Sequence, residues 1–446
     1  MNICIISNYS KTYLFEAVSK ELEQQGIHVY WIVCNKTLHH HLQETTDDSR
    51  ILYIGRQHIE QKETPIDEFK LNELIYGDRV LRLTPEDGLS FLTNIQKPIY
   101  DFLKDNNIRN VFGEITWAHE VLIHRMCKKR VELNCTFLNP HVVRIPNSNF
   151  AFFTDENQSQ FLERDREENF DWEKLIPKAP AYLKINNAIL KKSNSVMARL
   201  DRIKKFITDE NMDINDPTLT KDAADRIRKS VQQEWRKESY KKVLCSGYED
   251  CSDKPYVFLG LHKQPEASID VLGRYYEDQL QNIKNLWRAL PTGWNLIIKE
   301  HSVAIGDRPL EFYREIQALP NTFLIHEKTP SYSVIKNAAL VATVSGTIAY
   351  EAGLMGVPAI TFAPTFFNRM NRCNQARLTD LQEFNLKEIS ESLKTKKDNT
   401  ESFSVYVHKH THVGNVMDPI TDPNVLNEKN IKNITSAIME AILVCV

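Results

Sequence analysis

Short apolar runs alternate with amphipathic segments along this chain, and this alternation limits its fold more than any other feature. An apolar run at 2–8 is followed by a segment at 13–26 with helical spacing of its apolar residues, and then by a second apolar run at 28–34. A strand, a helix and a strand in this order indicate a βαβ unit, because parallel strands need a crossover connection. The sequence therefore predicts an α/β protein with parallel sheets covered by helices.

The alternation continues to about residue 155 and resumes at Lys254. Apolar runs at 110–114 and 135–140 predict further strands of the first sheet, with a helix between them. A chain of 446 residues also exceeds the usual size of a single core. We therefore predict two Rossmann-like, doubly wound domains at 1–155 and 254–446, and the last helix of the second could pack back on the first.

The segment between these domains, 156–253, has a different composition. It is rich in Glu, Lys, Arg and Asn, and it carries two amphipathic patterns, at 182–207 and 221–244, without a clear strand. We interpret it as a helical insert or linker. Both a solvated scaffold and a contact surface for a polymer, a lipid-linked substrate or a partner fit this composition.

Composition excludes some classes of function. The formal net charge is -3, so no global attraction to nucleic acid is expected. No run of about 18 apolar residues and no signal-like N-terminus are visible, so we expect neither a membrane span nor secretion. The eight cysteines are scattered without a CxxC pair. Reduced thiols in a cytoplasmic protein are the simplest interpretation.

Polar residues gather directly after three apolar runs of the second domain. The runs at 256–261, 294–300 and 340–345 each end in such a group. In open α/β sheets ligands bind outside the carboxyl ends of the strands, so the three groups predict one crevice that faces the first domain. The predicted lining residues are Gln264, Glu266, Lys299, His301, Ser345, Gly346, Thr347 and Glu351.

The chemistry of this crevice indicates a phosphorylated ligand. The stretch 345–347 precedes a helical segment, and a helix N-terminus favours anions while glycine allows close approach of the backbone. Lys299 and His301 add cationic or donor groups. Glu351 follows Thr347 by four residues on the same helix face and could accept two ribose hydroxyls.

Each residue of this crevice also has a simpler explanation when taken alone. Ser345 and Thr347 could merely cap a helix, and Glu351 could be a solvated helix residue. The occurrence of three such groups on three strand ends of one domain favours a binding site. The chain contains no GxGxxG and no GxxxxGK[ST] motif, which disfavours a Rossmann dehydrogenase or a P-loop enzyme.

The stretches LHKQPEAS, GWNLIIKEH and VSGTIAYEAGLMGVPAI resemble the motifs of bacterial capsular-polysaccharide biosynthesis glycosyltransferases, a group that includes the Kdo transferases. The resemblance covers about residues 254–370, with weaker echoes in VFGEITWAHEVLIHRMC and NPHVVRIPNSNFAFF. It implies a GT-B architecture, with the donor nucleotide in the C-terminal domain and the acceptor against the N-terminal one. It also implies transfer from a nucleotide-activated sugar, with CMP-linked ulosonic acids such as Kdo prominent.

The resemblance assigns roles to the crevice residues. It implies that Gln264, Pro265 and Glu266 line the donor pocket. It implies that Lys299 and His301 meet the donor phosphate or carboxylate, that the stretch 345–347 cradles phosphate, and that Glu351 holds the ribose. The family usually has His-Pro where this chain has His301-Ser302, which weakens the case for a strictly CMP-type donor.

A transferase of this kind needs a base for the acceptor hydroxyl. Glu114 is the first candidate, because VFGE puts a carboxylate at a strand end of the acceptor domain, and His119 is the second. The resemblance implies no metal cofactor, since cationic side chains and a helix N-terminus can stabilise the leaving phosphate. It further implies a surface polysaccharide, glycan or lipid-linked acceptor, and it leaves open a peripheral contact with the cytoplasmic membrane face.

Several alternatives share these features. A GT-B polyol-phosphate transferase of teichoic-acid type, a GT-B sugar epimerase and a binding protein with a degenerate site would all keep phosphate-cradling loops. Two histidine groups allow a metal hypothesis, the run 39–41 and the stretch HKHTH. In a strand, His408, His410 and His412 would share one face and could bind zinc, although a wet loop or an acceptor contact is the simpler interpretation.

Overall fold

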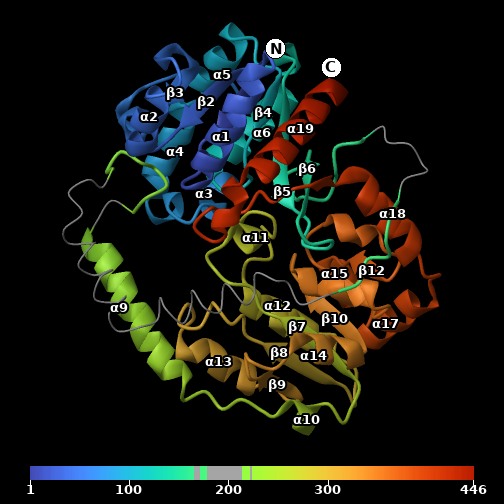
Figure 1. The fold of residues 1–446 in the computed structure, drawn as a ribbon. Coiled ribbons are helices and arrows are strands. Elements are labelled where there is room, and N and C mark those ends of the chain that lie inside the picture. Colours follow the sequence, from blue (N-terminus) through green and yellow to red (C-terminus); the bar gives the residue numbers. More distant parts are fainter. Residues whose placement is uncertain (165–170, 178–212, 221–222, 446) are drawn as a thin grey trace.

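The structure is a computed structural model that describes residues 1–164, 171–177, 213–220 and 223–445 (Figure 1). The described residues form two separate sheets, one above the other in Figure 1. The strands of the first are β1 (Asn2–Ile6), β2 (His28–Val33), β3 (Ile51–Tyr53), β4 (Asn110–Phe112), β5 (Thr136–Val142), β6 (Asn149–Phe153) and β13 (His412–Val413). The strands of the second are β7 (Tyr256–Gly260), β8 (Asn295–Lys299), β9 (Thr322–Ile325), β10 (Leu340–Thr343), β11 (Ala359–Thr361) and β12 (Cys373–Gln375).

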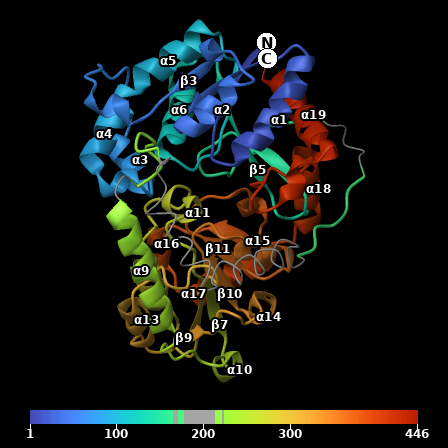
Figure 2. The ribbon, with the colours of Figure 1, turned by 60° about the vertical axis from the view of Figure 1, so that its left-hand side comes forward.

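Helices connect the strands and cover the faces of both sheets (Figures 1 and 2). Around the first sheet lie α1 (Lys11–Gln24), α2 (Lys36–Gln43), α3 (Leu71–Gly77), α4 (Pro85–Asn94), α5 (Gln96–Asp105) and α6 (Ala118–Lys129). The insert contains α9 (Ala223–Tyr240) and α10 (Tyr248–Cys251). The second domain contains α11 (Ala267–Asp270), α12 (Gln279–Arg288), α13 (Leu310–Gln317), α14 (Ser331–Asn337), α15 (Thr347–Leu354), α16 (Leu378–Glu383), α17 (Leu386–Thr395) and α18 (Thr400–His410), and the chain ends with α19 (Glu428–Val444). Short 3-10 turns lie at Asp48–Arg50, Arg56–Glu60, Leu81–Leu83, Val131–Leu133, Phe366–Arg369 and Pro423–Leu426.

Both sheets have the strand order of doubly wound folds. In the first sheet the order β3-β2-β1-β4-β5 is parallel, and β6 and β13 extend it as antiparallel strands. In the second sheet the order β9-β8-β7-β10-β11-β12 is parallel throughout. The direction of winding reverses beside β1 and beside β7, and such reversal points are where open α/β sheets bind ligands.

The central strands of both sheets are mostly apolar because helices cover both faces of each sheet. In the register of the first sheet Ile5 lies opposite Trp31 and Phe112, and each of these side chains is at most 1% exposed. Burying one such side chain contributes about 1.5–3 kcal/mol. The continuous apolar runs of the sequence are therefore the strands at the centre of each sheet.

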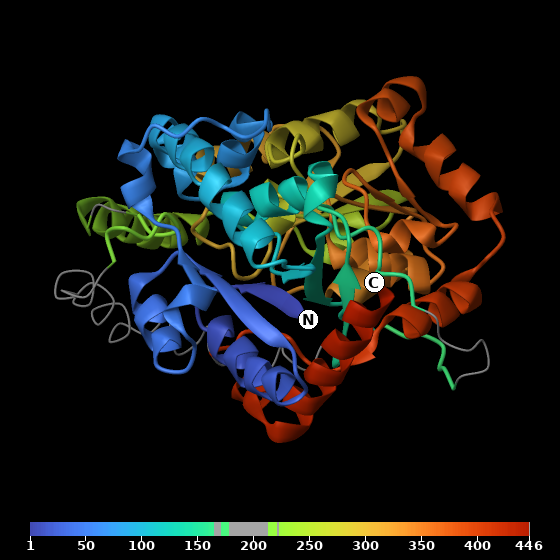
Figure 3. The same ribbon diagram turned by 90° about the horizontal axis from the view of Figure 1, so that it is seen from above.

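The end of the chain returns to the first domain. Asn427 caps α19 by accepting a hydrogen bond from the backbone N–H of Asn430. Ile434 and Ile438, four residues apart on the buried face of α19, share a core cluster with Leu14 of α1. Figure 3 shows the red C-terminal helix beside the blue N-terminal helix, and the two are in direct contact.

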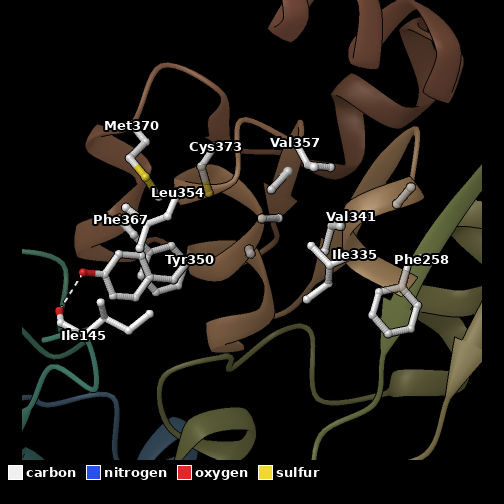
Figure 4. Packing of buried hydrophobic residues seen from close by; sticks show 14 of the residues in the cluster. Ile145, Phe258, Ile335, Val341, Tyr350, Leu354, Val357, Phe367, Met370 and Cys373 are labelled. Carbon is white, nitrogen blue, oxygen red and sulfur yellow. Dashed lines mark hydrogen bonds between the residues drawn. The ribbon is translucent and has the colours of Figure 1, made fainter. Parts of the chain in front are cut away.

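One apolar cluster joins the two domains. It contains Ile145 and Phe153 from the first domain and Tyr350 and Phe366 from the second. The Tyr350 ring stacks on Phe367 with 5.4 Å between centroids, and its hydroxyl donates to the carbonyl oxygen of Ile145 at 2.8 Å (Figure 4). A buried tyrosine hydroxyl requires such a partner. This contact fixes the two domains against each other at one side of the gap between the sheets.

The described part of the insert contacts both domains. Asp216, which is 1% exposed, accepts a hydrogen bond from Asn35 Nδ2 at 3.0 Å, just after β2. Further along, Gln233 of α9 donates to Asp307 Oδ1 of the second domain at 2.9 Å. In Figures 1 and 2, α9 spans the edge of the molecule from one domain to the other. The amphipathic pattern at 221–244 corresponds to α9, whereas the pattern at 182–207 falls outside the described residues.

The α/β, GT-B-like fold with two Rossmann-like, doubly wound domains and a helical insert is confirmed. The strand interpretation of HKHTH is wrong, because α18 continues through His410 and β13 begins at His412. Buried Phe403 and Val407, four residues apart, hold this segment as a helix against the second domain. Within the described ranges, no helix combines the length and the apolar character needed to cross a membrane.

Candidate active site between the domains

A cleft of about 1040 Å³ lies between the two domains. The loops after β7, β8 and β10 line it from the second domain, and the loops after β4 and β5 line it from the first. These are the carboxyl ends of strands at the reversal points of both sheets. Eight of the residues singled out in the sequence line this cleft: Glu114, Glu266, Lys299, His301, Ser345, Gly346, Thr347 and Glu351.

The N-terminus of α15 opens into the cleft. Gly346 is its N-cap residue, and the backbone N–H groups of Thr347 and Ile348 have no acceptor among the described residues. Gly346 packs so closely that an added Cβ would lie 2.6 Å from Thr343 Oγ1. Its own N–H donates to the same oxygen at 3.2 Å. The turn therefore presents two free N–H donors at the positive end of a helix, an arrangement that binds anions.

A buried histidine supports this turn. His262, directly after β7, receives a hydrogen bond at Nε2 from the Thr343 hydroxyl at 3.0 Å and a longer one from the backbone N–H of Ser345 at 3.4 Å. Burial lowers the pKa of His262 to about 3, so the ring is neutral and can accept both. The hydroxyl of Ser345 donates to the carbonyl of Ser268 at 2.5 Å. Ser345 therefore ties two loops together with its side chain.

Lys299 and Glu351 face the cleft from neighbouring elements. Lys299 Nζ donates to Ser331 Oγ at 2.7 Å. Burial lowers the pKa of Lys299, while the carboxylates of Glu327 and Glu351 oppose that shift. Burial also raises the pKa of Glu351, and the charges of Arg144 and Lys299 act against it. Both groups are thus held partly dehydrated, which is typical of functional sites.

His301 lines the cleft. The backbone N–H of Val303 donates to His301 Nδ1 at 3.4 Å, so the neutral ring carries its proton on Nε2. Partial burial lowers the pKa of His301, with the Glu266 carboxylate acting in the opposite direction. The neutral His301 ring can therefore donate one hydrogen bond from Nε2.

A buried ion pair supports the loop that carries His301. Glu300 is 1% exposed, and its two oxygens accept hydrogen bonds from Arg308 Nη1 at 2.6 and 2.7 Å and from the Tyr313 hydroxyl at 2.8 Å. Arg308 also donates to the carbonyl of His262. This pair connects the loop after β8 to the loop after β7.

Gln264 does not line the cleft. Its Nε2 donates to Asp270 Oδ1 at 2.7 Å, and its Oε1 accepts from Gln279 Nε2 at 3.0 Å. These bonds turn the amide toward α11 and α12, so Gln264 positions the loop after β7. Glu266, two residues later, lies in the cleft wall and accepts from the Ser268 hydroxyl at 2.8 Å.

The structure separates the two base candidates. Glu114 lines the cleft from the first domain, where it pairs with Lys11 and accepts from Asn8 Nδ2 at 2.9 Å. His119 lies outside the cleft on α6, with Nε2 3.5 Å from the buried thiol of Cys34. Burial lowers the pKa of His119 to about 3. Glu114 alone of the two faces the space where a ligand would react.

Several titratable residues of the cleft received no role from the sequence patterns. Arg144 follows β5 in a left-handed conformation, with φ of 65°, and its charge reaches both Glu351 and His301 across the cleft. His141, on β5, is buried and its pKa is lowered to about 3. Lys263, Glu327 and Lys328 also line the cleft. Lys263 stands within the quoted stretch LHKQPEAS, and His141 and Arg144 stand within the quoted stretch NPHVVRIPNSNFAFF, whose resemblance is weaker.

Metal-ligand geometry does not occur in the described part of the chain. No group of three or more His, Cys, Asp or Glu side chains there could hold a metal ion. His410 instead pairs with Glu163 at 3.0 Å, and His408 Nε2 lies 3.0 Å from the carbonyl of Glu173. These histidines hold the first part of the insert against α18.

No protein-family model and no curated protein match this chain. Similar solved structures include the UDP-GlcNAc 2-epimerase from Methanocaldococcus jannaschii, with 15% identity over 98% of this chain and 99% of that chain and a TM-score of 0.26. The calicheamicin glycosyltransferase CalG4 aligns with 12% identity over 99% and 98% of the two chains and a TM-score of 0.29. The KpsC β-Kdo 2,7 transferase from Thermosulfurimonas dismutans aligns with 11% identity over 78% and 89% and a TM-score of 0.35. At these values we take neither an activity nor a ligand from these proteins, and we assign the fold from the order of the two sheets.

Proposed function

We propose that this protein is a glycosyltransferase that uses a nucleotide-activated sugar as donor. The observation that carries the proposal is the cleft between the domains, where the free N–H groups at the start of α15 lie opposite the carboxylate of Glu114. One wall is suited to an anionic leaving group, and the other carries a group that can accept a proton. Direct displacement of the nucleotide by an acceptor hydroxyl needs both groups, on opposite sides of the reacting carbon.

The donor lies against the second domain in this proposal. Its phosphate accepts hydrogen bonds from the backbone N–H groups of Thr347 and Ile348, and Lys299 compensates its charge. The carboxylate of Glu351, four residues into α15, accepts hydrogen bonds from ribose hydroxyls. These groups supply positive charge and donors at the leaving phosphate, so we propose that transfer proceeds without a bound metal.

The acceptor hydroxyl attacks from the first domain. Its oxygen bonds to the anomeric carbon, its proton passes to Glu114, and the bond between the anomeric carbon and the donor phosphate breaks. The nucleotide leaves with the bond electrons, held at α15. Lys11 and Asn8 hold the carboxylate of Glu114 in place, because both donate to its oxygens.

Within this class we propose a CMP-activated ulosonic acid such as Kdo as the donor. Its carboxylate adds a second negative charge next to the phosphate, and Arg144 and His301 offer a second set of donors. We propose a surface polysaccharide or another glycan as acceptor, and no role for nucleic acid. We also propose a cytoplasmic location, with peripheral contact at the membrane where the acceptor is lipid-linked.

A donor panel tests this proposal. The protein is incubated with CMP-, CDP-, UDP- and GDP-linked donors, with and without glycan acceptors, and nucleotide release and sugar transfer are followed by chromatography and mass spectrometry. Transfer of sugar to the acceptor supports the proposal. Transfer of polyol phosphate would assign the teichoic-acid type of enzyme instead. Conversion of a UDP-sugar without any acceptor would assign an epimerase.

A further inference from the structure

A second cavity, of about 740 Å³, lies between the domains next to the cleft. The first domain lines it with residues of α6 and of the segment 68–73, and the second domain lines it with the loop 272–276 and the residues after β11. Asn157 and Leu272 line both cavities, and Asn157 Nδ2 donates to the carbonyl of Leu272 at 3.0 Å. These two residues therefore border both the second cavity and the cleft.

An aromatic platform forms one side of this second cavity. Tyr276 stacks on the buried ring of Phe362, with 5.3 Å between centroids and an interplanar angle of 13°, so its position is fixed. Tyr275 is 75% exposed and has a left-handed backbone, with φ of 72°. Its hydroxyl donates to Glu73 Oε2 at 3.2 Å across the domain boundary. A bulky side chain held exposed in an unfavourable conformation is a feature of ligand-binding positions.

The charge around the cavity is positive. Its lining holds five basic and three acidic side chains. Two of the acids, Glu73 and Glu156, are neutralised by Arg125 and Arg274, with four N–O distances of 2.7 Å. Lys70 and Lys128 are exposed at the rim, and neither makes an ion pair within the described ranges. Glu68, the third acid, is also exposed without an ion pair in the described ranges, so the two ammonium groups leave an excess of one positive charge beside the exposed ring of Tyr275.

We propose that the second cavity binds an anionic saccharide, and that this saccharide is the acceptor glycan of the proposed transferase. Flat rings with an exposed face stack on the C–H faces of sugars, and lysines at the rim attract carboxylates. Asn157 and Leu272 border both cavities, so a glycan held in the second cavity lies next to the cleft that Glu114 lines. The identification of this saccharide as the acceptor rests on the proposed function, whereas the binding of an anionic saccharide in the second cavity does not.

Calorimetry on the full-length protein tests the site directly. The probes are uronate- and sialate-containing oligosaccharides of four to six residues, each paired with a neutral oligosaccharide of the same length. We expect at least one acidic probe to bind about tenfold or more tightly than its neutral counterpart. Tyr275→Ala should weaken binding of that probe about tenfold. Lys128→Glu should also weaken its binding, by a larger factor at low salt than at high salt. Binding of acidic and neutral probes with equal affinity, or no binding of any probe, would overturn the proposal.

Matched variants separate this site from the nucleotide site. Tyr76→Ala removes another exposed tyrosine, 63% exposed and outside both cavities, and should leave probe affinity unchanged. Glu351→Gln should weaken nucleotide binding and leave the affinity for the acidic probe unchanged. If Tyr275→Ala binds the probe within twofold of wild type while nucleotide still binds, the second site is wrong and the transferase proposal stands. If the probe binds as expected and no nucleotide does, the saccharide site stands and the transferase proposal is wrong.

Discussion

Replacing Glu351 by Gln tests whether this residue binds the ribose of the nucleotide or is an ordinary helix residue. The substitution keeps the size of the side chain and one acceptor oxygen, and it removes the negative charge. In the cleft Glu351 lies close enough to Lys299 and Arg144 for their charges to affect its pKa, and no protein donor bonds to it within the described part of the chain. Its carboxylate is therefore available to ribose hydroxyls.

The expected loss of nucleotide affinity follows from the chemistry of that contact. A hydrogen bond to a charged acceptor contributes about 1.5–3 kcal/mol. The dissociation constant of the nucleotide should thus rise roughly 10- to 150-fold, since each 1.4 kcal/mol corresponds to about tenfold. Isothermal titration calorimetry with CMP and UDP measures this change.

Glu351→Gln should weaken nucleotide binding without lowering the stability of the protein. Burial raises the pKa of Glu351 above its ordinary value, so the native protein binds more protons than the unfolded chain between the two pKa values. The free energy of unfolding therefore falls as pH rises through that window, and the ionised carboxylate lowers stability at neutral pH. Glu351→Gln should leave the melting temperature at pH 7 unchanged or raise it. A variant with unchanged nucleotide affinity, or with a lowered melting temperature, would refute this role of Glu351.

Three further predictions concern other parts of the site. Glu114→Gln should leave donor affinity intact and lower the transfer rate by roughly 10²–10⁴-fold, the usual contribution of a general base, in single-turnover kinetics. Gly346→Ala should destabilise the protein by about 1–3 kcal/mol in urea unfolding, because the new Cβ would lie 2.6 Å from Thr343 Oγ1. It should also weaken nucleotide binding, because the turn must shift. Arg308→Met should lower the free energy of unfolding by about 3–5 kcal/mol, because it leaves the carboxylate of Glu300 buried without its partner.

Controls for these predictions come from exposed positions. Glu132→Gln changes a half-exposed carboxylate outside both cavities and should transfer sugar like the wild type. Arg314→Met breaks an exposed pair with Glu311 and should change stability by at most about 1 kcal/mol. A transfer rate of Glu114→Gln within a few-fold of wild type would mean that another group accepts the proton. A loss of donor affinity in that variant would mean that Glu114 belongs to the donor site.

The strand ends of the second domain could be predicted from the sequence because of how parallel sheets are buried. β7, β8 and β10 lie at the centre of the sheet, so each is a continuous apolar run, and the first polar residues after each must lie at its carboxyl edge. Lys299 and Thr347 therefore lie where the pattern places them. Gln264 does not lie in the cleft wall as predicted, because its side-chain amide is turned toward Asp270 and Gln279 by hydrogen bonds. The spacing of apolar residues gives no information about such contacts within loops.

Contacts between distant segments could not be predicted in this way. β13 pairs with β6, so that His412 lies opposite Phe150, although hundreds of residues separate them in the chain. A two-residue strand has no periodicity, and its pairing depends on the return of the chain to the first domain. The same holds for Arg144, whose position in the cleft depends on the hydrogen bond between Tyr350 and Ile145 that holds the domains together.

The position of a bound nucleotide shows whether the cleft is the donor site. The measurement is a crystal structure of the protein with CMP and, separately, with UDP. We expect one of them to bind in the cleft between the domains, with its phosphate at the backbone N–H groups of Thr347 and Ile348 and its ribose hydroxyls at Glu351. A nucleotide bound elsewhere, or reversed so that its base lies at the start of α15, would rule out this donor site.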